Sequence, residues 1–398
     1  MSGALPQIPV AKPQLDEQEV EAVRRVVLSG WVTQGPEVAA FEAEFAEYVG
    51  APYACAVSNC TTALHLALMA VGVGPGDEVI TVSHSFVATA NAIRYCGAVP
   101  VFVDIEAGGF NMDPDLIEAA VTARTKAIVC VHQLGMPCDL RRIVEVGRHF
   151  AIPVIEDAAC ATGSEILWEG EWQRIGRPHG DIACFSFHPR KVVTTGDGGM
   201  LTTANPDYDR KFRLWRQHGM SVADTVRHGS KQVIYEEYPE LGYNYRMTDL
   251  QAAIGRVQLR RLPELVSRRR QIAAKYENLL KDVPGLVTPI EPAWTRSNWQ
   301  SYCVMLPGDI DQKVTMQALL DQGISTRRGV MNIHLESAYA ASGSHRASTD
   351  LARSVAAQTG SVILPLFAQM TDQDLTRVGG ALRELMVPPL SLPSARVG

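Results

Sequence analysis

The chain has 398 residues, more than the ~250–300 at which a single hydrophobic core stops growing, so we expect two lobes. Apolar residues make up 46% and charged residues 20%, as in an ordinary soluble globular protein. The net charge is −6, with 37 basic against 43 acidic residues. This balance argues against nucleic-acid binding, because phosphate recognition needs a basic excess. The one dense basic run, Arg268 to Arg270, is predicted to be a solvated helix face.

No stretch reaches the ~18 consecutive apolar residues that cross a bilayer, and the N-terminal residues lack the apolar centre of a signal peptide. We therefore expect a cytoplasmic protein with no membrane partner, whose eight cysteines are reduced. Cys184 and His188 lie four residues apart, but no second ligand pair accompanies them. No metal site is expected.

Short β-branched runs alternate with stretches of helical periodicity between about residues 55 and 205. This alternation, with strands that are apolar throughout, predicts an α/β fold with a mostly parallel sheet covered on both faces. In such sheets the chemistry gathers at the carboxyl ends of the strands. The expected strands are 78–82, 99–104, 127–131, 152–156 and 182–187, and the expected helices are 88–96, 114–123 and 140–150.

The pattern changes after Gly199 and predicts a smaller C-terminal α+β domain. We assign residues 1–255 to an N-terminal arm with the large domain, and residues 256–398 to the small domain. Thr248 can cap a helix that we expect to end before Pro263. The later expected elements are a helix over 266–280, a strand over 302–306, helices over 314–322 and 371–385, and a frayed tail with prolines at 388, 389 and 393.

The segment from Ser58 to Leu68 has two interpretations. Small polar residues precede a helix, and free N–H groups at a helix start attract phosphate, here beside the hydroxyls of Thr61 and Thr62. The alternative is that Thr61 or Thr62 only caps the helix.

Two further candidate residues follow buried strands. A carboxylate at Asp157 can hold a ring nitrogen protonated or form an ordinary ion pair. Lys191 precedes a glycine-rich turn that permits close backbone approach; burial there would lower its pKa towards about 7–8 and make its amine nucleophilic. The alternative is a surface lysine. With an aromatic ring at Phe86, these are the parts that a pyridoxal phosphate enzyme needs.

The chain carries eight characteristic stretches in a fixed order: 35–42, 58–64, 74–80, 85–92, 97–104, 156–159, 186–191 and 242–247. Their order resembles that of the DegT/DnrJ/EryC1/StrS family of sugar aminotransferases, over about residues 8 to 386. The resemblance implies a fold-type-I, pyridoxal-phosphate-dependent transferase. Segments 131–139 and 326–334 look most like those of perosamine-synthase-type enzymes.

Residue by residue, the resemblance implies roles around the cofactor, pyridoxal 5′-phosphate. Lys191 would hold it covalently as a Schiff base, and Asp157 would pair with its ring nitrogen. The other implied contacts are Phe86 on the ring, Cys60, Thr61 and Ser186 at the phosphate, Cys160 near the phenolic oxygen, and Asn244 reaching the phosphate from the neighbouring subunit of a homodimer.

Two cysteines depart from the family pattern. Cys60 stands where the family usually has glycine, and Cys160 where it usually has glutamine or histidine. A thiol is a weak hydrogen-bond donor, so the resemblance implies a weakened contact to the phenolic oxygen at residue 160.

The implied reaction moves an amino group from glutamate to a nucleotide-linked keto sugar of the 4-keto-6-deoxy type. The weaker substrate-binding candidates are His188, Arg327, Arg328 and His334. The two arginines either bind a diphosphate or carboxylate bidentately or form a solvated surface pair.

Other activities stay open. One is a cyclitol aminotransferase that uses glutamine, and another is a protein that binds pyridoxal phosphate without turnover. The dehydratase branch of the family has histidine in place of the lysine, so Lys191 counts against it.

Overall fold

The computed structural model describes residues 6–222, 227, 230–341 and 343–386. Its centre is an eight-stranded sheet in which the strands from β8 to β13 are parallel, as the alternation of strands and helices predicted. β9 runs antiparallel to both of its neighbours. In spatial order the strands are β1 (Tyr53–Val57), β9 (Gly199–Thr203), β8 (Ile182–Ser186), β5 (Val154–Asp157), β4 (Thr125–Val131), β2 (Glu78–Val82), β3 (Val99–Val103) and β13 (Arg346–Ala347).

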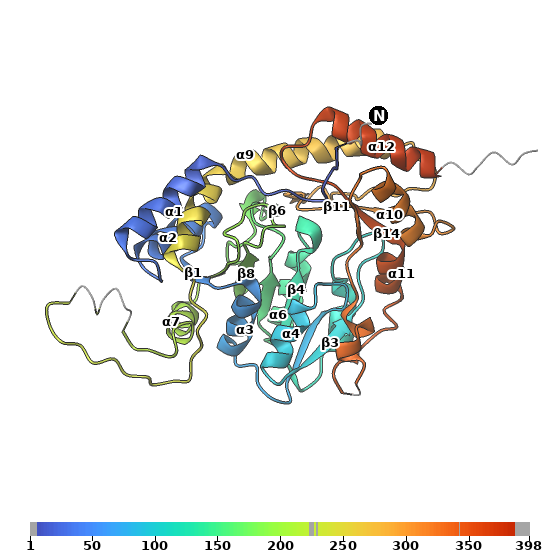
Figure 1. Cartoon of the computed structure of the whole chain (residues 1–398). Coiled ribbons are helices and arrows are strands. Elements are labelled where there is room, and N and C mark those ends of the chain that lie inside the picture. Colours follow the sequence, from blue (N-terminus) through green and yellow to red (C-terminus); the bar gives the residue numbers. More distant parts are fainter. Residues whose placement is uncertain (1–5, 223–226, 228–229, 342, 387–398) are drawn as a thin grey trace, which may run out of the picture.

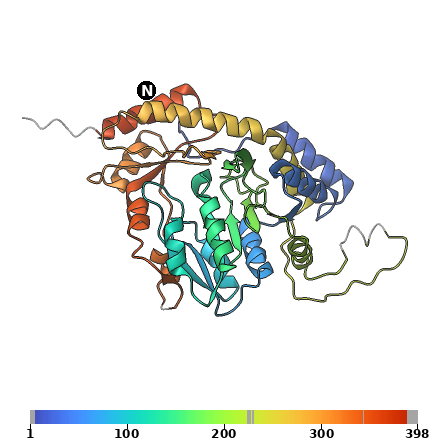
Figure 2. The ribbon, with the colours of Figure 1, turned by 180° about the vertical axis from the view of Figure 1, so that it is seen from behind.

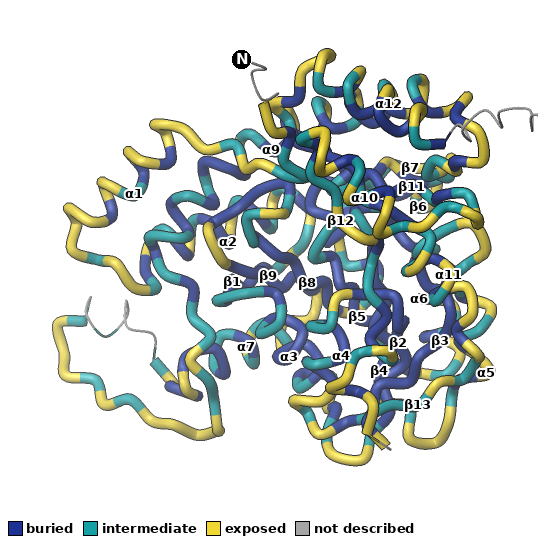
Figure 3. The backbone as a smooth tube through the Cα atoms, turned by 45° about the vertical axis from the view of Figure 1, so that its right-hand side comes forward, coloured by how far each residue is buried: buried dark blue, intermediate teal, exposed yellow. Residues whose placement is uncertain are grey.

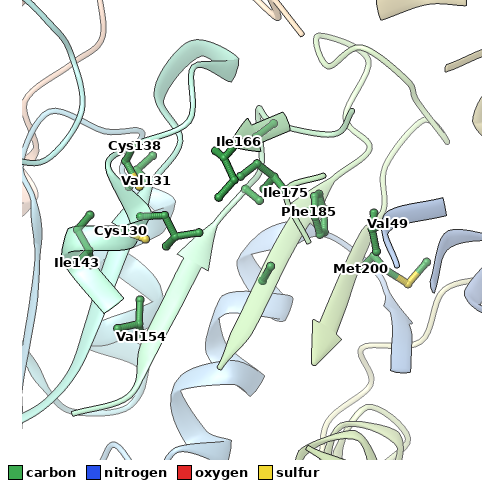
Figure 4. Packing of buried hydrophobic residues seen from close by; sticks show 14 of the residues in the cluster. Val49, Cys130, Val131, Cys138, Ile143, Val154, Ile166, Ile175, Phe185 and Met200 are labelled. Atoms are coloured by element: carbon green, nitrogen blue, oxygen red, sulfur yellow. The ribbon is translucent and has the colours of Figure 1, made fainter. Parts of the chain in front are cut away.

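Helices cover both faces of the sheet, and each face has its own core (Figures 1 and 2). Within β4, Val129 packs on the side of α3, α4 and α7, whereas Cys130 packs on the side of α2, α5 and α6. Figure 4 shows Cys130 with Val154 and Phe185 in the latter core. This division arises because successive side chains of a strand point to opposite faces. The helices are α1 (Glu17–Ser29), α2 (Pro36–Val49), α3 (Cys60–Ala70), α4 (Ala88–Tyr95), α5 (Ile117–Ala120, after a 3-10 turn at Pro114–Leu116), α6 (Leu140–Phe150) and α7 (Pro206–Trp215).

One long helix, α9 (Asp249–Leu280), packs against both the core of the large sheet and the core of the C-terminal part, so the predicted end before Pro263 was wrong. Proline removes one N–H and crowds the preceding turn, which costs about 3 kcal/mol in a helix interior. Leu262 and Leu265 flank this position and are buried in the core. Burying each leucine contributes about 1.5–3 kcal/mol, enough to offset the proline. Thr248 caps the helix as predicted.

The C-terminal part has a core of its own around a three-stranded antiparallel sheet. Ile8 near the N-terminus packs into this core, and its N–H donates to the Gly323 carbonyl at 2.8 Å. The predicted division between residues 255 and 256 falls within α9 and stays a prediction. The elements are β11 (Tyr302–Met305), β14 (Ser361–Leu364), β12 (Arg327–Arg328), α10 (Gln312–Asp321), α11 (Ala352–Gly360) and α12 (Asp372–Met386).

A separate three-stranded sheet consists of β10 (Thr295–Arg296), β6 (Glu165–Trp168) and β7 (Glu171–Arg174). The predicted proline-rich tail lies outside the described residues. Across the described parts of the chain, no helix combines the length and apolar composition that a membrane crossing requires.

The arginine run on α9 joins the helix to its surroundings and is not the solvated face that the sequence suggested. Arg269 is buried, and burial lowers its pKa to about 10. All three guanidinium groups donate to backbone carbonyls. The acceptors are Ala368 and Met370 for Arg268, Trp299, Gln300 and Leu366 for Arg269, and Arg296 and Ser297 for Arg270.

Replacing Arg269 with alanine should lower the free energy of unfolding by about 3 kcal/mol, because three carbonyls lose a donor and a cavity is left. Chemical denaturation measures the change. Arg24→Ala is the matched control, because Arg24 is exposed and lies 3.8 Å from Glu21, so its loss should cost less than about 0.5 kcal/mol. Equal stability of the two variants would contradict the joining role of Arg269.

Candidate active site

A cavity of about 390 Å³ lies at the carboxyl ends of the parallel strands, between the large sheet and the three-stranded C-terminal sheet. Loops after β2, β4 and β8, the end of β5, and β12 all contribute to its wall. The sheet topology therefore gathers residues that are far apart in the sequence. The predicted residues among its lining are Cys60, Thr61, Phe86, Asp157, Cys160, Ser186, His188, Lys191, Arg327 and Arg328.

Lys191 is half-buried in this cavity, and its Nζ donates to the Sγ of Cys160 at 3.1 Å. Burial by itself lowers the pKa of Lys191, but the interactions with Cys160, Cys60 and Asp157 raise it by more. The net pKa lies above the ordinary lysine value. The sequence-based expectation of a lowered lysine pKa was therefore wrong, because it considered burial without the neighbouring thiol.

Asp157 is buried at the end of β5, and burial raises its pKa above the ordinary value. Its carboxylate accepts from the Thr89 hydroxyl at 2.8 Å and from the Ala159 N–H at 3.2 Å. These bonds and the charge of Lys191 oppose part of the rise. Thr89 in turn contacts the Ser85 hydroxyl at 2.8 Å. The carboxylate is thus held in one orientation.

The start of α3 forms another wall of the cavity. Asn59 caps the helix by accepting from the Thr62 N–H at 3.0 Å, so Thr62 belongs to a capping box and Asn59 is the N-cap. The first turn of a helix has free N–H groups that favour anions. Gly199 of β9 lies against this turn, where an added Cβ would come within 2.8 Å of the Cys60 nitrogen. The close approach predicted for the glycine-rich turn is confirmed.

The side chains of this cavity fit pyridoxal phosphate. Phe86 is 61% exposed on the wall, so a large apolar ring is available for stacking. An amine at Lys191, a buried carboxylate at Asp157 and a helix start at Cys60 complete the types of group that such a cofactor needs. Each role remains a prediction for its residue.

The substrate-side candidates divide into two groups. His188, Arg327 and Arg328 line the cavity, and Arg328 also lies 3.4 Å from the Glu336 carboxylate. His334 is not among the lining residues, and its Nδ1 instead contacts the Ser83 hydroxyl at 2.6 Å.

Asn244 also lies outside the lining of its own chain's cavity and is exposed. It lies near the C-terminal end of the segment between α7 and α9, whose described residues project from the body of the molecule in Figure 1.

Sequence reasoning missed two residues that shape the site. Thr89 follows Ser85 by four residues, and this spacing could have indicated a pair of hydroxyls on one helical face. Asn298 donates from Nδ2 to the carbonyls of Cys160 and Thr162, at 2.8 and 2.9 Å, and so holds the turn that carries Cys160. No local signal points to Asn298, because its partners lie more than 130 residues away.

Comparison with known proteins decides the family. The model of the DegT/DnrJ/EryC1/StrS aminotransferase family matches residues 13–383. The chain belongs to this family. The GDP-perosamine synthase of Caulobacter vibrioides is 40% identical over 388 residues, covering 96% of this chain and 99% of that protein.

Solved structures agree with this assignment. The aminotransferase TlmJ from Streptoalloteichus hindustanus superimposes with a TM-score of 0.86 at 37% identity, covering 95% of this chain and 98% of that chain. Spr1654 from Streptococcus pneumoniae, solved in its PLP-form, gives a TM-score of 0.86 at 28% identity, with 96% and 98% covered. The chain is an aminotransferase with the α/β fold of pyridoxal-phosphate-dependent relatives, which confirms the predicted family and fold class.

Thr89→Val should destabilise the protein in a pH-dependent way. The variant raises the pKa of Asp157 further, so the folded state binds this proton more tightly than the unfolded state. The loss should be about 2 kcal/mol above the pKa of Asp157, where the carboxylate is charged, and about 1 kcal/mol below it. Chemical denaturation at several pH values measures the two losses. In an Asp157→Asn background the loss caused by Thr89→Val should be the same at every pH. In the protein that keeps Asp157, a loss that is equal at every pH would show that Thr89 does not stabilise the charged Asp157 carboxylate.

Proposed function

We propose that the protein transfers an amino group from glutamate to a nucleotide-linked 4-keto-6-deoxy hexose, with pyridoxal phosphate bound at Lys191. The observation that carries this proposal is the presence of the Lys191 amine, the buried Asp157 carboxylate and the exposed Phe86 ring in one cavity. The bound cofactor supplies an electron sink that allows the α-proton of an amino acid to leave.

The residues of the chain act on this chemistry in distinct ways. With the cofactor bound, the Lys191 amine would accept the proton that leaves the donor α-carbon and donate it back, as general base and then general acid. Asp157 keeps the ring nitrogen protonated, and Thr89 and the Ala159 N–H hold its carboxylate in place. The start of α3 and the buried Ser186 hydroxyl bind the phosphate.

The far wall of the cavity supports a nucleotide-linked acceptor. Arg327 and Arg328 bring two guanidinium groups from β12, and such groups bind diphosphates bidentately. The 40% identity to a GDP-perosamine synthase supports the same substrate class.

A homodimer with shared sites is part of the proposal. The described part of the projecting segment between α7 and α9 is largely exposed (Figure 3). It carries apolar side chains in water, since Val233, Tyr235 and Leu241 are 82%, 87% and 83% exposed. Exposed apolar groups of this size favour a protein partner. Because Asn244 lies at the base of this segment and outside its own cavity, a second copy of the chain is the partner that would give it a cofactor contact.

Product analysis tests the proposed reaction. The protein loaded with pyridoxal phosphate should change its absorbance to that of the amine form with glutamate, and should then convert an NDP-4-keto-6-deoxy hexose to a product with the mass of an amino sugar. Lys191→Ala should give neither change. Replacing both Arg327 and Arg328 with alanine should raise KM for the nucleotide sugar at least about tenfold, with a smaller effect on the glutamate half-reaction.

Other outcomes would overturn this function. Amination of a keto-inositol with glutamine, without turnover of any nucleotide sugar, would make the protein a cyclitol aminotransferase. An absorbance that no amino donor changes would make it a non-catalytic binding protein.

Subunit mixing tests the shared site. Lys191→Ala and Asn244→Asp are each expected to be inactive, the latter because its carboxylate repels the cofactor phosphate. After subunit exchange, heterodimers should regain activity, because one of their two sites keeps both native residues. Mixing two differently tagged Lys191→Ala preparations is the control and should restore none. Verified heterodimers without activity would show that both residues serve the same subunit's site.

A further inference from the structure

The contact between Cys160 and Lys191 places a nucleophilic sulfur beside a nucleophilic nitrogen, with 3.1 Å between Sγ and Nζ. Both side chains line the 390 Å³ cavity, so small molecules that enter it reach the sulfur. Cys160 is half-buried, whereas Cys60 and Cys184 are buried and burial raises the pKa of both thiols. Of the three cysteines near this end of the sheet, Cys160 is therefore the one that small molecules in the cavity can reach and that also contacts an amine.

We propose that hydroperoxides join Cys160 and Lys191 through a covalent Sγ–Nζ bond whenever the lysine amine is not occupied by the cofactor. Peroxide oxidises a cysteine sulfur to a sulfenic acid, and the Cys160 sulfur is open to the cavity and lies 3.1 Å from the Lys191 amine. A sulfenic acid can condense with a nearby nitrogen, and here the nearest amine is already in contact distance.

The reaction balances in two steps. The Cys160 sulfur attacks the peroxide, the O–O bond breaks, and the products are a sulfenic acid and, from hydrogen peroxide, one water. The Nζ lone pair of Lys191 then attacks Sγ, the S–O bond breaks, and the leaving hydroxide takes a proton from nitrogen to form a second water. The sulfur loses two electrons overall and the peroxide gains them.

The first step prepares the second through electrostatics. Contact with Cys160 is one of the causes that raise the pKa of Lys191 against the effect of burial. Oxidation of the sulfur to the sulfenic acid changes that contact, so burial, which favours the neutral amine, is opposed less. The neutral amine is the form that attacks the oxidised sulfur.

If Lys191 anchors the cofactor, as proposed above, the Sγ–Nζ bond would block loading of pyridoxal phosphate. The bond would also shield the sulfur from further, irreversible oxidation. Two thiols added from solution reverse it, because they form their own disulfide and return Cys160 and Lys191 to the free thiol and amine.

Peptide mapping tests the bond directly. The full-length, cofactor-free protein is treated with hydrogen peroxide, digested and analysed by mass spectrometry. We expect the peptides of Cys160 and Lys191 to be linked, with a combined mass smaller by two hydrogen atoms, and dithiothreitol to separate them. Cys160→Ser and Lys191→Arg should abolish the linkage. Cys96→Ser is the matched control and should keep it, since Cys96 is also half-buried but lies outside the cavity lining.

Two results would overturn the proposal. One is a Cys160 sulfenic acid that a dimedone probe traps while no linked peptide forms. The other is a linked peptide that carries an additional oxygen atom, which would indicate an S–O–N bridge instead of the S–N bond.

The same measurement separates this inference from the proposed function. Protein saturated with pyridoxal phosphate should resist linkage, because Nζ is occupied. Equal linkage with and without the cofactor would overturn the role of Lys191 as anchor and leave the Sγ–Nζ bond established.

Discussion

A carboxylate withdrawn from water must be compensated by its neighbours, and this requirement organises the site around Asp157. The compensation comes from separate parts of the chain: Thr89 on α4, the Ala159 N–H after β5, and Lys191 after β8. These parts meet because β5 pairs directly with β8, and α4 follows β2 in the same sheet. The order of the strands therefore brings together the groups that oppose the rise in the pKa of this carboxyl group.

The large domain could be predicted from its sequence because its signals are local. Runs of β-branched residues indicated the strands, and α6 has the bounds that periodicity predicted, with Asp139 as its cap. The position of the site also followed, since parallel strands place their carboxyl ends at one edge. For that reason residues as distant in sequence as Phe86 and Lys191 were expected together, and both line the cavity.

The errors arose where a distant part of the chain decides the outcome. Pro263 indicates a helix end locally, but the buried leucines beside it keep α9 continuous. Arg269 belongs to a run that suggests solvent, yet its acceptors are carbonyls about 30 and 97 residues away. The pKa of Lys191 depends on Cys160, which lies 31 residues earlier. A sequence pattern within one segment cannot identify interaction partners that lie in a distant segment.

Because α9 is continuous, the number of its residues sets both the distance and the rotation between two fixed points. One end is fixed by the Thr248 cap beside the large domain, and the Arg269 anchor lies farther along against the carbonyls of the small domain. Inserting a single residue between them would rotate everything beyond it by about 100° and advance it by about 1.5 Å. Arg269 would then point away from its acceptors. The number of residues between these two points is thus constrained as strictly as the identity of either, although no residue between them lines the cavity itself.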